Sequence, residues 1–68
     1  MNYNQIRQTF NLSIPQIEAL FALKARGWTL NFDNFQHLPG EKAVVIQVIG
    51  GSGMIMFMVI EPDGHIHS

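Results

Sequence analysis

The sequence contains no cysteine, and this absence excludes disulfide bonds, thiol catalysis and cysteine-ligated zinc. Charged residues are also scarce, at 13% of the chain, compared with roughly 25% in an average soluble domain. The longest apolar run, Met54–Ile60, is far shorter than the roughly 18 residues that indicate a membrane span. The first residues have neither the basic nor the apolar region of a signal peptide. We therefore expect a cytoplasmic protein without membrane contact, since a cysteine-free chain also suits a reducing compartment.

The chain is small, and its size limits the stability that its own core can provide. Its 68 residues allow one domain, spanning 1–68, and the hydrophobic content of 47% argues against disorder. A core in a chain of fewer than about 70–80 residues rarely supplies more than about 3–5 kcal/mol of net stability. Because disulfides are excluded, further stability has to come from a metal ion or a partner chain.

One segment carries signals for both the start and the end of a helix. Ser13 and Gln16 have the spacing of a capping box, in which each side chain bonds the backbone N–H of the other residue. Gly27 suits the left-handed residue that ends a helix, so we predict a main helix over residues 14–26. Leu23 points away from the expected core stripe, toward a second apolar contact. That stripe comprises Ile14, Ile17, Leu20, Phe21 and Ala25.

After this helix the sequence has the pattern of short strands separated by turns. Asp33-Asn34 is a turn signal that ends the first strand. Sequential strands usually pair with their neighbours, so the expected fold is α+β, with one main helix packed on a small antiparallel meander. Residues 1–12 are expected to form either an arm or a short helix. The predicted strands lie at about 28–33, 42–50 and 54–61, with a fourth at 64–67 left open.

The second and third predicted strands are apolar on both faces, which is unusual for strands that face solvent. Between Ala43 and Ile49 only Gln47 is polar, and Met54–Ile60 contains no polar residue. One helix covers only one face, so either the N-terminal arm and the loop 35–38 fold over the second face or, as we favour, that face forms a homodimer or binds another protein. The sequence leaves open which face the helix covers. We expect branched and aromatic residues such as Phe57 to face the helix and the methionines to point outward. The expected interface residues are Leu23, Gln47, Met54, Met56 and Met58.

The residue types that catalysis needs are present only in unsuitable contexts. Gly50–Gly53 is rich in glycine, but a predicted strand follows it, whereas a phosphate loop precedes a helix and ends in a lysine. Of the serines, Ser13 caps the helix, Ser52 lies in a turn and Ser68 is the last residue. Because no nucleophile is placed beside a base, we expect no enzyme activity, no catalytic residue and no cofactor.

Two other binding functions stay open as alternatives. His65 and His67 have a spacing that places both on one face, and with His37 they are candidate metal ligands, although no wider ligand spacing supports a site. Four basic residues against five acidic residues give little charge for binding phosphates, which argues against nucleic acid. The basic residues are Arg7, Lys24, Arg26 and Lys42.

Together these patterns favour a small cytoplasmic protein-interaction module. We expect an accessory subunit or regulator that acts by binding another protein and forms a homodimer through an apolar sheet face. The first alternative is a small DNA- or RNA-binding regulator, and the second is a histidine-based metal-binding module.

Overall fold

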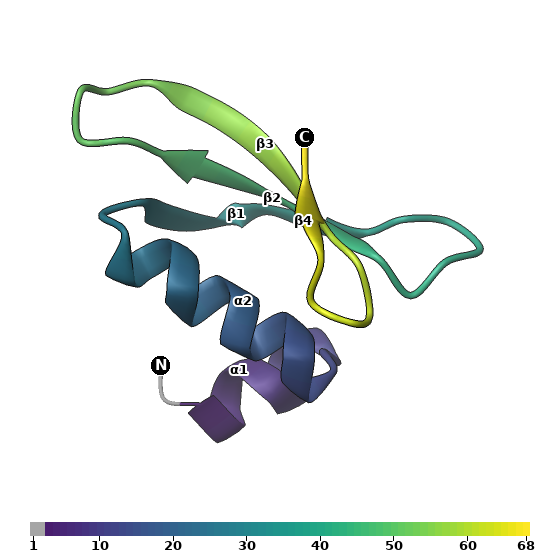
Figure 1. The fold of residues 1–68 in the computed structure, drawn as a ribbon. Coiled ribbons are helices and arrows are strands. Elements are labelled where there is room, and N and C mark those ends of the chain that lie inside the picture. The colour runs from purple at the N-terminus through teal and green to yellow at the C-terminus, as the bar shows by residue number, and fades with distance from the viewer. Residues whose placement is uncertain (1–2) are drawn as a thin grey trace.

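The computed structural model describes residues 3–68, in which two helices lie against one side of a sheet (Figure 1). Residues 1 and 2, part of the segment expected as an arm or short helix, lie outside the described residues. The helices are α1 (Tyr3–Phe10) and α2 (Ile14–Ala25). The strands are β1 (Thr29–His37), β2 (Val44–Ile49), β3 (Ile55–Ile60) and β4 (Ile66–His67). The predicted α+β class, with a main helix on an antiparallel meander, is confirmed.

The segment before the main helix forms α1 rather than an extended arm. Ile6 is buried in the core, and the ring of Phe10 stacks on that of Phe32 with 4.8 Å between centroids. Asn11 follows the helix with a φ of 53°, a left-handed conformation that asparagine adopts more readily than most residues. These apolar contacts hold α1 against the rest of the domain.

The predicted capping box at the start of α2 is present. The Gln16 N–H donates to Ser13 Oγ over 3.2 Å, and the Ser13 N–H donates to Gln16 Oε1 over 2.9 Å. Both side chains also reach the sheet. Gln16 Nε2 donates to the carbonyls of Lys42 (2.8 Å) and Ile60 (3.1 Å), and the Ser13 hydroxyl donates to that of Pro62 (2.7 Å). One local cap therefore also joins α2 to the strands.

The buried face of α2 differs from the predicted stripe. Ile14 and Phe21 were expected in the core but are 44% and 38% exposed, and Ala25 is exposed as well. Leu23, expected on a second side, is only 3% exposed. The prediction was wrong at these positions because the Gln16 side chain bonds the strands and turns its own side of the helix toward the sheet. The buried residues of α2 are Gln16, Ile17, Ala19, Leu20 and Leu23.

The four strands form one antiparallel sheet in the order β1-β2-β3-β4. Tight hairpins join β2 to β3 and β3 to β4. Gly53 and Gly64 occupy corresponding places in these hairpins, with φ of 87° and 92°, and each donates its N–H back across the turn. A side chain would be strained at either position, so both turns depend on glycine.

β1 is longer than predicted and is interrupted by a bulge. Asn31 pairs with Gln47, but the next paired residue of β1 is Phe35, opposite Ile46. Residues 32–34 therefore have no partner in β2. The sequence predicted that the first strand ends at a turn within this segment. The prediction was wrong because the turn residues are accommodated as a bulge, after which pairing resumes as far as His37.

The core lies between the helices and one face of the sheet. Met56 pairs with Val48, and Met58 pairs with Ile46, so both methionines share the face that packs on the core. The expectation that the methionines point outward and Phe57 inward was therefore wrong. Flexible thioethers fill the periphery of a core that branched residues occupy at its centre. The fully buried strand residues are Val44, Ile46, Val48 and Ile60.

We predict that replacing Gln16 with leucine lowers the free energy of unfolding by about 2–4 kcal/mol, because the carbonyls of Lys42 and Ile60 lose their donor. Urea unfolding followed by circular dichroism measures this change. Gln8→Leu, at an exposed position of α1, is the matched control and should leave the urea midpoint within experimental error. Equal midpoints for the two variants would contradict the prediction.

Candidate functional site

The side of the sheet that faces away from the helices carries a continuous set of apolar side chains. It is called here the outer face, and two of its residues, Ile55 and Phe57, are 59% and 54% exposed. Its other apolar members are only half-buried, although neither helix lies on this side. The outer face consists of Val45, Ile49, Ile55, Phe57 and Val59 around Gln47.

A hydrogen-bonded amide cluster lies within the outer face. Gln47 Oε1 accepts from Asn31 Nδ2 over 2.6 Å and from Asn34 Nδ2 over 3.0 Å. Asn31 Oδ1 in turn accepts from the backbone N–H of Asp33 over 3.1 Å. These bonds hold the oxygen of Gln47 within the sheet and connect the bulge of β1 to β2.

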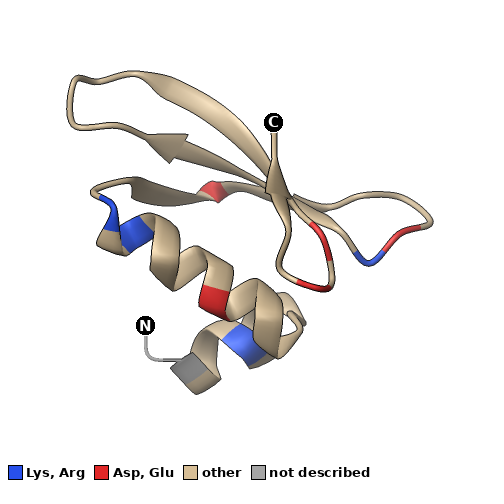
Figure 2. Ribbon diagram, in the orientation of Figure 1, with Lys and Arg blue, Asp and Glu red and all other residues tan. Residues whose placement is uncertain are grey.

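No charged residue lies on β2 or β3, which form most of the outer face (Figure 2). A shallow hollow of about 310 Å³ on this side is lined by polar and apolar residues in equal number: Asp33, Asn34, Phe35, Gln36, Val45 and Phe57. Apolar side chains around fixed amides supply contact area and a few directional hydrogen bonds. This combination is typical of the central part of a protein-binding surface.

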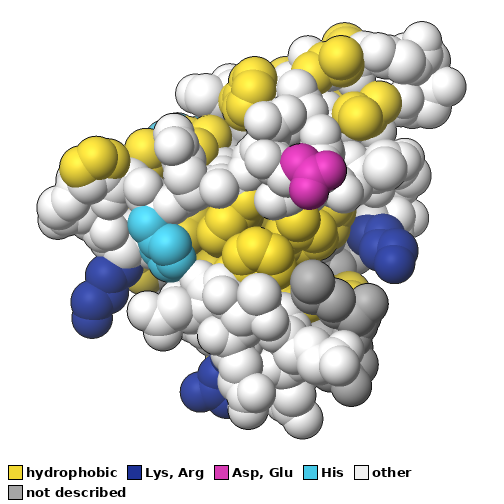
Figure 3. Space-filling model, turned by 180° about the vertical axis from the view of Figure 1, so that it is seen from behind, with side chains coloured by type: hydrophobic (Ala, Val, Ile, Leu, Met, Phe, Trp, Pro, Cys, Tyr) yellow, Lys and Arg dark blue, Asp and Glu magenta, His cyan; other side chains and the backbone are white. Residues whose placement is uncertain are grey.

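A second apolar hollow, of about 300 Å³, lies between the two helices and β1. Hydrophobic side chains are visible between the helical layer and the sheet when the molecule is seen from behind (Figure 3). Phe21 lines this hollow, which accounts for the exposure of a residue expected in the core. Among the described residues, Lys24 and Thr29 are its polar lining. It opens on the core side of the sheet and is separate from the outer face.

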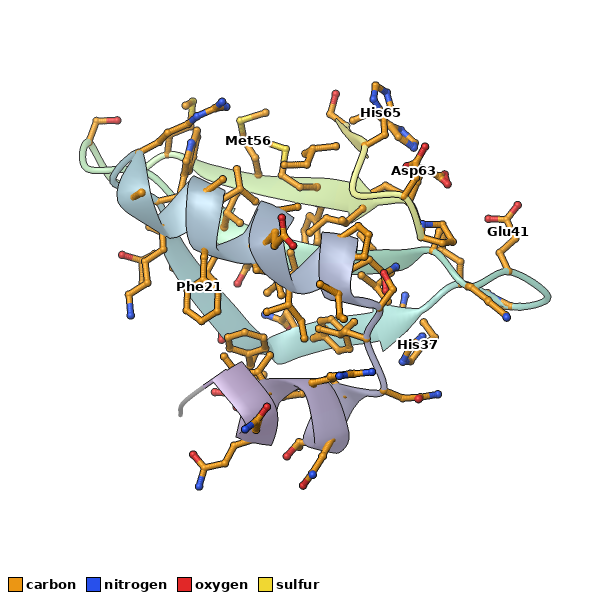
Figure 4. The ribbon with its side chains drawn as sticks, turned by 60° about the horizontal axis from the view of Figure 1, so that its bottom comes forward. Phe21, His37, Glu41, Met56, Asp63 and His65 are labelled. Carbon is orange, nitrogen blue, oxygen red and sulfur yellow. The ribbon has the colours of Figure 1, made fainter. Side chains whose placement is uncertain are left out.

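The structure distributes the predicted interface residues over three places. Leu23 is in the core, and Met58 and Met56 (labelled in Figure 4) pack against the core from the helix side of β3. Met54 is 52% exposed and directly precedes β3. Of these residues only Gln47 belongs to the outer face.

The sequence therefore predicted correctly that β2 and β3 are apolar on both faces, but the prediction of which face meets the helices was wrong. The set Ile55, Phe57 and Val59 was expected to face the helix because its members are branched or aromatic. The two faces differ in their packing against the helices, because Met56 and Met58 share the face on which Ile46 and Val48 are buried. Both faces are apolar in the sequence, so this difference has no local signature.

The histidines do not form a common site. Nε2 of His37 lies 2.7 Å from the carbonyl oxygen of Phe10, at the end of β1 (Figure 4). The rings of His65 and His67 stack with 5.8 Å between centroids, and Nε2 of His67 lies 3.3 Å from Glu61 Oε1. Within residues 3–68, no group of three or more histidine and acidic side chains is arranged to hold a metal ion.

The basic residues are also dispersed. Arg7 lies on α1, Lys24 on α2, and Arg26 and Lys42 lie in the connections after α2 and before β2 (Figure 2). Phosphate binding relies on several cations acting along one surface. These positions do not provide a basic strip on any single element.

Comparison with protein-family models, curated proteins and solved structures finds no match to this chain. Within the described part of the chain, neither helix has the length and apolar character required to cross a membrane. The feature of the chain that points to a function is therefore its exposed apolar outer face.

We predict that removing divalent metal with EDTA leaves the melting temperature unchanged. The helix cap, the core and the hairpins are held by contacts within the chain, whereas a fold that depends on a metal site unfolds on chelation. Thermal melts followed by circular dichroism, with and without EDTA, test this. A clear fall in melting temperature would instead assign His37, His65 or His67 as ligands.

Proposed function

We propose that the protein is a small cytoplasmic interaction module, an accessory subunit or regulator that binds another protein through the outer face. The observation that carries this proposal is the exposure of Ile55 and Phe57, at 59% and 54%, on strands that carry no charge. Extended apolar patches on a small domain usually mark interaction sites. The absence of cysteine supports the cytoplasmic assignment.

The chemistry of the outer face favours a protein partner over a polar small molecule. Phe57 and Val45 stand beside the shallow hollow, where an apolar side chain of a partner can be buried. The amide cluster around Gln47 offers further donors and acceptors next to this anchor point. A partner surface of complementary shape would therefore gain apolar burial at the centre and hydrogen bonds close by.

Lysine substitutions on the two faces of β3 should have different effects. Met56→Lys places a charge on the core side and should lower the free energy of unfolding by about 1–3 kcal/mol. Phe57→Lys places the same charge on the outer face and should cost less than about 1 kcal/mol, because that position is 54% exposed. Urea unfolding at low micromolar concentration compares the two variants. A more damaging Phe57→Lys would show that Phe57, not Met56, supports the core.

Site-directed photo-crosslinking in the native host tests the binding surface directly. Val45 is replaced by p-benzoyl-phenylalanine, because it lies on β2 at the outer face. We expect one discrete crosslinked product, and an added Phe57→Lys should abolish it. A product with about twice the 7.7 kDa mass of the chain identifies a second copy as the partner, and a different mass identifies another protein.

The same photo-reactive residue at Glu18, an exposed position on α2, is the matched control. Glu18 lies on the helical layer and should give no discrete product. The proposal fails if Val45 gives no product or if both positions give products of equal yield.

A further inference from the structure

The hollow of about 300 Å³ between α1, α2 and β1 has walls that the fold holds in place. On one side the ring of Trp28 lies against Gly50, so close that a Cβ atom added to this glycine would be 3.2 Å from Trp28 Cζ3. On another side Phe32 stacks on Phe10, with 4.8 Å between the ring centroids. Because Trp28 and Phe32 both line the hollow, two of its aromatic walls are formed before any ligand arrives. A largely preformed hollow between helices is a common setting for a small-molecule site.

Most of the remaining lining is apolar. Phe21 points from α2 toward α1 (Figure 4), and its ring is 38% exposed. Water in a hollow with such walls makes few hydrogen bonds, so an apolar ligand displaces it favourably. Besides the two rings already described, the apolar lining consists of Ile6, Ile17, Leu20, Phe21 and Leu30.

Lys24 is the single charged side chain among the described residues that line the hollow. It is exposed as well as lining, which places it at the opening. Its charge has no acidic partner, because the one ion pair within residues 3–68 joins His67 to Glu61. The hollow therefore combines an apolar interior with one uncompensated positive charge at its opening.

The end of α2 does not cancel this positive charge. Carbonyl groups at the end of a helix carry partial negative charge, which would oppose an anion. Here they already accept backbone N–H groups from the residues that follow the helix. The carbonyl of Leu23 accepts from Trp28 over 3.2 Å, and that of Lys24 accepts from Gly27 over 3.0 Å. The ammonium group of Lys24 is thus the charge that a ligand in the hollow meets.

We propose that this hollow binds a small organic acid, with an apolar body inside it and a carboxylate paired with the Lys24 ammonium group. A cavity of about 150 Å³ lined by Leu, Ile and Phe binds benzene, so twice that volume suits a body of about ten carbon atoms. Burial of this body supplies most of the affinity, and Lys24 selects a negative head group. The site is independent of the proposed function, because the hollow opens on the core side of the sheet, away from the outer face.

The emission of Trp28, the single tryptophan of the chain, measures binding directly on the full chain. The probes are decanoate and decylamine, which have the same chain length and opposite charges, at concentrations below those at which they form micelles. We expect a saturable change in emission with decanoate, and a dissociation constant about two- to fivefold lower than that of decylamine. Circular dichroism should show an unchanged fold. An emission that does not saturate with decanoate, or tighter binding of decylamine, would overturn the proposal.

Charge reversal at Lys24 tests the selection of the head group. Lys24 is exposed, so Lys24→Glu should keep the fold and bind decylamine more tightly than decanoate. Lys42→Glu makes the same change of charge at an exposed residue that does not line the hollow, and it should keep the preference for decanoate. If both variants lose that preference equally, the net charge of the chain and not Lys24 selects the ligand, and the proposal is wrong.

Chemical shifts of methyl groups locate decanoate on the wild type, whatever the stability of the variants. Leu20 and Leu30 line the hollow, and their methyl resonances should move as decanoate is added. Val45 and Val59 belong to the outer face, and their resonances should stay in place. The largest shifts at Val45 and Val59 would show that decanoate binds the outer face instead, which would overturn the proposal.

Discussion

The structure depends on the buried side chain of Gln16, which is 2% exposed. Its oxygen completes the helix cap, and its nitrogen donates to two carbonyls, one before β2 and one at the end of β3. Removing this side-chain donor from the two carbonyls would cost free energy, most of all at Ile60, which is fully buried. This single side chain therefore joins the start of α2 to the beginning of β2 and the end of β3.

The sequence predicted the local features of the fold well because their causes are local. The capping box, the hairpin glycines and the strand pattern each depend on residues within a few positions of one another. The choice of face depends on packing between the helices and the strands, which are far apart in the sequence, as are the partners of Gln16, 26 and 44 residues away. Because β2 and β3 are apolar on both sides, their pattern contains no information about this choice. A prediction from local preferences alone consequently reversed the positions of Met56 and Phe57.

The bulge in β1 shows how a correct local signal can have a different tertiary outcome. Asn34 lies in a segment whose composition is typical of turns, yet its side chain bonds Gln47 on the neighbouring strand. Asn31 bonds the same oxygen. The unpaired residues 32–34 are therefore held to β2 by side-chain bonds from Asn31, just before them, and from Asn34, the last of them. Gln47 was predicted as an interface residue because it is the one polar residue in an apolar strand. It has a structural role in addition to any contact with a partner.

The exposure of the outer face follows from the small size of the chain. Two short helices cover one side of the sheet, and β4 covers only the end of β3. A core of this size rarely supplies more than about 3–5 kcal/mol of net stability. A partner that binds only the folded state adds about 2.7 kcal/mol when its concentration is 100 times its dissociation constant. The two quantities are comparable, so under the proposed function binding and folding would be strongly coupled. The exposed apolar residues Ile55 and Phe57, which gain nothing from burial in the isolated domain, are the groups through which the proposed partner would stabilise it.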